Sequence, residues 1–213
     1  MRIAVFISGR GTNLKALLDA AEKPSFPGEI ALVVSNRPGA PGLQFATDAG
    51  VSQCVVDHRD FATREDFEAA LNDQLALAKI DLICLAGFMR ILTAGFVDGW
   101  KGRLMNIHPS LLPSFRGLNV HERMIDAAVK IAGCTVHFVS SEMDAGPIIG
   151  QAALPVLPDD TAETLAARLL VLENKLYPEC LRVIVDKGAR LSGGVVQFDT
   201  PLTDDKAIFN PHP

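Results

Sequence analysis

Asn106 and His108 are residues whose types and spacing can support a reaction. They stand two positions apart in the segment LMNIHPSLLP, and alternate side chains of an extended chain lie on one face. Pro109 favours extended backbone at His108 and cannot continue a central ladder, so we expect a strand to end there. Ligands of open α/β sheets bind beyond the carboxyl ends of the strands. An amide and an imidazole at that edge can take part in catalysis, or can simply satisfy backbone groups of the loop.

A glycine-rich turn, SGRGTNL at residues 8–14, follows the first apolar segment. Glycines let a turn lie close to a ligand, Thr12 or Asn13 can cap the following helix, and free amides in its first turn attract an anion. The third glycine of a dinucleotide fingerprint and the ending of a P-loop are both missing. The turn therefore favours a phosphate over a dinucleotide, although a capped turn without a ligand fits equally well.

Other polar residues have ordinary interpretations when taken alone. Asp144 stands two residues before a glycine, as turn-forming aspartates do, and His137 suits a core or supporting position. Arg64 and Glu173 fall on predicted helices as solvated charges. The loop after the strand at 81–86 is unusually apolar, so it either lines a pocket or folds back onto the core.

These residues need a scaffold, and the chain predicts an α/β fold with a doubly wound, mostly parallel sheet. Apolar segments alternate with helical periodicity, which indicates parallel strands joined by helices. We expect strands over 2–8, 29–35, 51–56, 81–86 and 104–108, with helices from 12, over 42–49, from 63 to 80 and over 94–99. An antiparallel pair at 133–139 and 148–156 and a long helix from 160 to about 186 should follow.

The composition limits the classes of protein that fit. With 213 residues and 48% hydrophobic content, we expect one domain over residues 1–190 and a tail over 191–213 with a peripheral strand. A formal net charge of −5 argues against a nucleic-acid partner. The four cysteines lack zinc-ligand spacing, so we expect reduced thiols and no metal. The apolar segments are too short for a signal peptide or a bilayer, which favours the cytoplasm and no membrane partner.

Four motifs occur in order: SGRGTNL at 8–14, LAGFMRIL at 85–92, NIHPSLLP at 106–113 and MDAGPI at 143–148. Together they resemble the glycinamide ribonucleotide formyltransferase family, and the likeness extends to about Tyr177. The resemblance implies a Rossmann-like formyltransferase fold. It also implies transfer of a formyl group from 10-formyltetrahydrofolate, used as a co-substrate, to the amine of glycinamide ribonucleotide in purine biosynthesis.

The resemblance also implies a role for each candidate residue. The catalytic residues of the family match Asn106, His108 and Asp144. Its nucleotide site matches Gly11, Thr12, Asn13 and Glu173. Its folate site matches Arg64, which would meet the glutamate tail, and Met89, Arg90, Ile91, Leu92, Ser140, Ser141, Glu142 and Met143. His121 and His137 would support the site from behind. Asn119 and Asn174 depart from the family pattern, because histidine is frequent at both positions.

The reaction explains why such residues would be needed. Attack of an amine on a formyl carbon develops an oxyanion, which the Asn106 amide and a protonated His108 can stabilise. A nearby carboxylate favours the charged imidazole, so Asp144 would keep His108 protonated and could accept the proton that leaves the amine. Alignment of two bound substrates would then replace a nucleophilic residue.

Several alternatives stay open at this point. A formyltetrahydrofolate deformylase should carry an N-terminal regulatory domain, and a methionyl-tRNA formyltransferase an additional C-terminal domain, for which we see no segment. A non-catalytic nucleotide-binding module would keep the fold without the activity. A dinucleotide-dependent reductase is disfavoured because Ser35-Asn36-Arg37 offers no acidic residue after the second strand. A monomer and a homodimer both fit.

Overall fold

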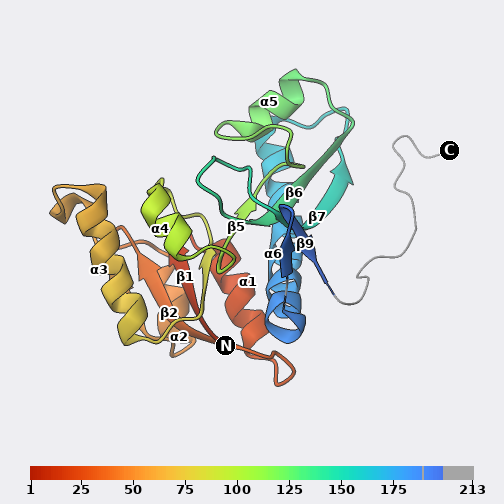
Figure 1. Cartoon of the computed structure of the whole chain (residues 1–213). Coiled ribbons are helices and arrows are strands. Elements are labelled where there is room, and N and C mark those ends of the chain that lie inside the picture. Colours follow the sequence, from red (N-terminus) through yellow and green to blue (C-terminus); the bar gives the residue numbers. More distant parts are fainter. Residues whose placement is uncertain (189, 199–213) are drawn as a thin grey trace.

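The computed structural model describes residues 1–188 and 190–198. A seven-stranded sheet, in the order β3-β2-β1-β4-β5-β6-β7, runs through the molecule (Figure 1). Its strands are β1 (Arg2–Ile7), β2 (Glu29–Ser35), β3 (Gln53–Val55), β4 (Leu82–Leu85), β5 (Leu104–His108), β6 (Ile131–Phe138) and β7 (Ile148–Pro155). The first five are parallel, and β6 and β7 are antiparallel to their neighbours. The prediction of a mostly parallel sheet with an antiparallel pair is therefore confirmed.

Helices cover both faces of the sheet. They are α1 (Thr12–Ala21), α2 (Leu43–Asp48), α3 (Arg64–Leu77), α4 (Ala94–Gly99), α5 (Val120–Asp126) and α6 (Ala162–Lys187), with a 3-10 turn η1 (His58–Asp60). Alternate residues of β1 face opposite layers. Ile3, Val5 and Ile7 pack against α1 and α6, whereas Ala4 and Phe6 pack against α3 and α4. This alternation explains why β1 reads as a continuous apolar run.

Tyr177 links the long helix α6 to the central strands β4 and β5. Its side chain is fully buried, and its hydroxyl lies 3.2 Å from the carbonyl oxygens of both Leu85 and Met105. These carbonyls belong to β4 and β5, which are neighbours in the sheet. The predicted long helix is thus confirmed, and it braces the strand that carries Asn106 and His108.

The strand order predicts where a ligand would bind. From β1 the chain moves outward to β2 on one side, whereas β4 pairs with β1 on the other. The loops after β1 and β4 therefore diverge at a topological switch point, where doubly wound folds bind ligands. The glycine-rich turn follows β1 and the apolar loop follows β4, so the two predicted substrate loops lie at this point.

Some predicted elements were wrong or incomplete. No helix was predicted at α5, because its buried side chains, Val120 and Met124, give only one turn of periodicity. The strand predicted over 51–56 covers only 53–55. The tail begins with a hairpin, β8 (Arg190–Ser192) and β9 (Val195–Gln197), instead of one strand. Its turn is Gly193-Gly194 with positive φ at both residues, which is a typical hairpin signal. Residues 199–213 of the predicted tail lie outside the described part.

Within residues 1–188 and 190–198, no helix is long and apolar enough to cross a bilayer. The same residues contain no group of three or more histidine, cysteine or carboxylate side chains placed to hold a metal. The cysteines are free thiols, and burial raises the pKa of Cys84 and Cys134 to about 12. Thiols of this kind are inert at neutral pH.

Candidate active site

Asn106 and His108 leave β5 at its carboxyl end, opposite residues of β6. Asn106 pairs with His137 in the register of the two strands, and His108 pairs with Thr135. The side chain of His108 is buried, with 6% of the residue exposed, whereas Asn106 is partly exposed. The side chains of Asn106 and His108 on β5 therefore lie beside those of His137 and Thr135 on β6, on one face of the sheet.

Asp144 comes from the loop between β6 and β7 and meets His108. Its Oδ2 lies 3.4 Å from His108 Nδ1 and accepts a hydrogen bond of 2.8 Å from the backbone N–H of Gly117. Its side chain is 13% exposed and its φ is 51°, a left-handed conformation that aspartate and asparagine tolerate better than most residues. The structure thus brings together the three predicted catalytic residues.

Gly146 explains how the loop holds this position. A Cβ built at Gly146 would lie 1.7 Å from the carbonyl oxygen of Phe138, far inside van der Waals contact. Only glycine lets the returning chain pass this close to the end of β6. The glycine two residues after Asp144 therefore forms part of the turn and also lets the loop backbone pass close to Phe138 at the end of β6.

Both ring nitrogens of His108 face oxygen acceptors. Nε2 lies 3.0 Å from the carbonyl oxygen of Phe115, and Nδ1 faces the Asp144 carboxylate. Each ring nitrogen therefore has an oxygen to which an N–H can donate. The distance of 3.4 Å between His108 Nδ1 and Asp144 Oδ2 is long for a hydrogen bond. An N–H at Nδ1 could therefore donate to a substrate oxygen instead.

His137 orients Asn106 from behind. Its Nδ1 lies 2.9 Å from the carbonyl oxygen of Phe138, which makes Nδ1 the protonated nitrogen. Its Nε2 lies 3.3 Å from Asn106 Nδ2 and can accept from that amide. Burial lowers the pKa of His137 and so favours the neutral ring, although the Phe138 carbonyl and Asp144 oppose the shift. One amide proton of Asn106 is then fixed, and the other stays available to a substrate.

The glycine-rich turn and α6 form a second polar site. Gly11 has φ 74°, and a Cβ there would lie 2.7 Å from Gly42 Cα, so a side chain would separate the two loops. Thr12 begins α1, but the prediction that Thr12 or Asn13 caps this helix is wrong, because Gly11 is the cap residue. Asn13 Nδ2 instead donates to Glu173 Oε2 at 2.8 Å, across 160 residues of chain.

Glu173 is a buried carboxyl group rather than a solvated charge. The residue is 9% exposed, and burial raises the pKa of its side chain while the hydrogen bond from Asn13 opposes this. Three buried polar atoms find no hydrogen-bond partner within residues 1–188 and 190–198: Asn13 Oδ1, His121 Nε2 and Asn174 Oδ1. Burial also lowers the pKa of His121. Buried acceptors without partners are costly, and a polar ligand would satisfy them.

If this is the nucleotide site that the family resemblance implies, Asn13→Ala should raise the apparent KM for glycinamide ribonucleotide about 10-fold and leave the KM for 10-formyltetrahydrofolate unchanged. The substitution removes both an unpartnered acceptor and the donor that holds Glu173. Steady-state kinetics with each substrate varied in turn would measure both constants, with Asn72→Ala on α3 as the control. A rise confined to the folate constant would contradict this assignment.

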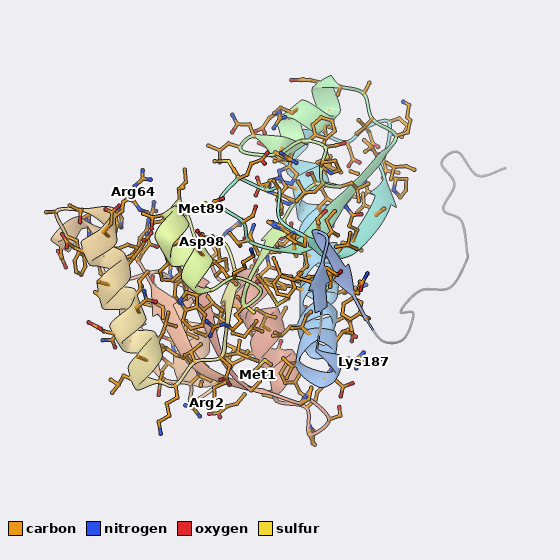
Figure 2. The ribbon with its side chains drawn as sticks, viewed as in Figure 1. Met1, Arg2, Arg64, Met89, Asp98 and Lys187 are labelled. Atoms are coloured by element: carbon orange, nitrogen blue, oxygen red, sulfur yellow. The ribbon has the colours of Figure 1, made fainter. Side chains whose placement is uncertain are left out.

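The predicted folate residues come from the start of α3, from the loop after β4 and from the loop between β6 and β7. Met89, Ile91 and Met143 are large apolar side chains that are more than half exposed. Figure 2 shows Met89 beside α4 and Arg64 at the start of α3. From the second loop, Ser140 donates to the carbonyl oxygen of Glu142 at 3.0 Å, and Glu142 pairs with Arg116 at 2.6 Å. Arg90 is half-buried and Leu92 packs against the core.

Two residues in this region carried no sequence signal. Ser8 belongs to the predicted glycine-rich turn and Glu68 to the predicted helix from 63 to 80, yet both are buried. Phe115 and Gly117, which contact His108 and Asp144, were also missed because loop backbone contacts have no residue signature. A cavity of about 400 Å³ between α3 and α4, lined by residues such as Asn72 and Trp100, includes none of the predicted site residues.

Known proteins share both the sequence and this architecture. The formyl transferase family profile matches residues 1–181. Phosphoribosylglycinamide formyltransferase of Haemophilus influenzae is 40% identical over 93% of this chain and 93% of its own length. The trifunctional purine biosynthetic protein adenosine-3 of Drosophila melanogaster is 49% identical over 90% of this chain, which spans only 14% of that protein.

A solved structure agrees with the sequence comparison. Glycinamide ribonucleotide transformylase 1 from Symbiobacterium toebii superposes with a TM-score of 0.90 at 44% identity, and the match covers 93% of each chain. Fold and sequence therefore lead to one assignment. The chain belongs to the formyl transferase family, among the phosphoribosylglycinamide formyltransferases.

Proposed function

We propose that this protein transfers the formyl group of 10-formyltetrahydrofolate to the amine of glycinamide ribonucleotide, a step of purine biosynthesis. The observation that carries the proposal is the cluster of Asn106, His108 and Asp144 at the end of β5, with Asp144 Oδ2 3.4 Å from His108 Nδ1. Nucleotide and folate sites on either side of the cluster would bring the amine and the formyl carbon together. Such alignment is worth about 7–11 kcal/mol in favourable cases.

In the proposed mechanism, the amine nitrogen attacks the formyl carbon and a new C–N bond forms. The carbonyl electron pair moves to oxygen, and the free amide proton of Asn106 and the Nδ1 proton of His108 stabilise the oxyanion. Collapse restores the carbonyl and breaks the bond to N10 of the folate. Asp144, directly or through water, accepts the proton that the amine loses and passes it to N10 as that nitrogen leaves.

The remaining proposals concern the substrate sites. The nucleotide phosphate would lie on the amides of Gly11 and Thr12, and Glu173 with Asn13 would bind polar groups of the sugar. Met89, Ile91, Leu92 and Met143 would flank the folate ring together with Ser141 and Glu142, and Arg64 and Arg90 would pair with its glutamate carboxylates. Glu173, being buried with a raised pKa, suits a hydrogen-bond partner of neutral ligand groups.

We further propose residues 1–190 as one catalytic domain, residues 191–213 as a tail, and a cytoplasmic monomer or homodimer without nucleic-acid or membrane partners. Residues 190–198 support attachment of the tail to the domain, because Val196 and Phe198 pack against the main core. The net charge of −5 agrees with small-molecule substrates.

One assay tests the proposed function. Loss of the formyl group from 10-formyltetrahydrofolate should be followed by absorbance, with and without glycinamide ribonucleotide. We expect deformylation only when the nucleotide is present, with one formylated product formed per folate consumed. Deformylation at the same rate without the nucleotide would indicate a hydrolase, and no reaction in either case would indicate a binding module.

A further inference from the structure

The loop Met89–Leu92 is attached at both ends to buried polar side chains of other elements. We call this segment the 89–92 loop. It follows β4 and precedes α4, and two of its four side chains, Met89 and Ile91, are 65% and 62% exposed. Exposed side chains contribute little packing energy of their own, so the backbone must be fixed by other means if the loop is to present a defined surface.

Ser8 holds the first end of the loop. It lies at the end of β1, is only 4% exposed, and its hydroxyl oxygen accepts a hydrogen bond of 2.7 Å from the backbone N–H of Met89. The same hydroxyl donates to Asn36 Oδ1 at 2.5 Å, and Asn36 is fully buried. Because the single hydroxyl proton is directed to Asn36, a lone pair is left facing Met89.

Glu68 holds the other end. It lies on α3, is 5% exposed, and its Oε1 accepts a hydrogen bond of 2.6 Å from the backbone N–H of Thr93. Its Oε2 accepts a further hydrogen bond from the Thr93 hydroxyl. Thr93 is also the residue that caps α4, through a bond from Phe96 N–H to its hydroxyl. A buried carboxylate therefore fixes both the end of the loop and the start of the next helix.

Arg64 lies on the same face of α3 as Glu68, one helical turn earlier. The attachment of Thr93 to Glu68 thus also sets the distance between the loop and the cation predicted to meet the folate tail. Neither Ser8 nor Glu68 contacts the cluster at the end of β5 through any hydrogen bond found in the described residues. Their effect should therefore fall on one substrate and not on the chemical step.

We propose that Ser8 and Glu68 are positioning residues that set the affinity for the folate by fixing the two ends of the 89–92 loop. The inference rests on the proposed function, because it takes the loop as part of the folate site. Ser8 accepts a hydrogen bond from Met89 N–H, and Glu68 accepts one from Thr93 N–H. Loss of either bond leaves that backbone N–H without its partner and releases one end of the loop.

Steady-state kinetics of the full chain test this, with 10-formyltetrahydrofolate and glycinamide ribonucleotide varied separately. Ser8→Ala and Glu68→Ala should each raise the KM for the folate about 10-fold, with the kcat and the nucleotide KM within about 2-fold of wild type. The double variant should show about the product of the two effects, since the sites are independent. Glu68→Gln retains an acceptor for Thr93 N–H and should recover most of the affinity.

Ser35→Ala is the matched control. Ser35 is a fully buried serine at the end of the neighbouring strand β2, and its hydroxyl binds the backbone of Arg37 instead of the 89–92 loop. It should leave the folate KM unchanged. If Glu68→Ala does not fold, Thr93→Val takes its place, with an expected rise of about 3-fold.

An unchanged folate KM in Ser8→Ala and Glu68→Ala, with an active wild type, would overturn the proposal. An equal rise of both KM values would also overturn it, because a general structural defect does not distinguish the substrates. An inactive wild type would instead contradict the proposed function, so the two failures are distinguishable.

Discussion

Asp144→Asn should lower kcat about 10³-fold while the protein stays folded. Asparagine keeps an oxygen that can accept from Gly117 N–H and tolerates the φ of 51° at this position. It loses the negative charge that faces His108 Nδ1 and the ability to accept a proton. Single-turnover rates with both substrates bound would isolate the chemical step, and thermal unfolding would report the state of the fold.

Asp159→Asn provides the control for this substitution. Asp159 is an exposed aspartate in the loop before α6, and its amide variant should keep the wild-type rate. A rate for Asp144→Asn within about 10-fold of wild type would remove Asp144 from the proton-transfer step.

His108→Ala should cause a loss of similar size, about 10³-fold in kcat, because the two side chains serve the same step. The substitution removes the ring that would donate to the oxyanion, whereas the carboxylate stays and keeps its bond to Gly117. Both substrate KM values should change little, because neither of the two proposed substrate sites includes the ring. Rapid-quench measurement of formylated product would give the rate.

Binding provides the check on His108→Ala. Calorimetric titration with glycinamide ribonucleotide should give the wild-type affinity, since Asn13 and Glu173 are untouched. A variant that turns over normally, or one that has lost the nucleotide but reacts normally at saturation, would refute the assigned role.

Most of the scaffold could be predicted from the sequence because its elements carry strong local signals. The prediction for β2 matches the observed bounds, and α4 was placed correctly from its residues. Continuous apolar runs identify strands buried on both faces, and two strand-like segments flanking the loop at 140–147 identify the antiparallel pair. The short α5 was missed because two apolar residues four apart give no periodicity that a loop would not also show.

The site was predictable only in part from the residues themselves. The shared face of Asn106 and His108 follows from strand geometry, but nothing in the spacing shows that Asp144 reaches the same place, and the resemblance to a known family supplied that. Ser8 and Met89 are 81 residues apart, and Asn13 and Glu173 are 160 apart. Contacts over such separations depend on the strand order, so a buried glutamate and an exposed one look alike in the sequence.

The central claim is that His108 and Asp144 act as one unit in formyl transfer, and a double-mutant cycle on kcat tests it most directly. If the two side chains serve one step, His108→Ala combined with Asp144→Asn should be no slower than the slower single variant, about 10³-fold below wild type. Multiplying losses, to about 10⁶-fold, would show that the two residues act independently and would contradict the mechanism.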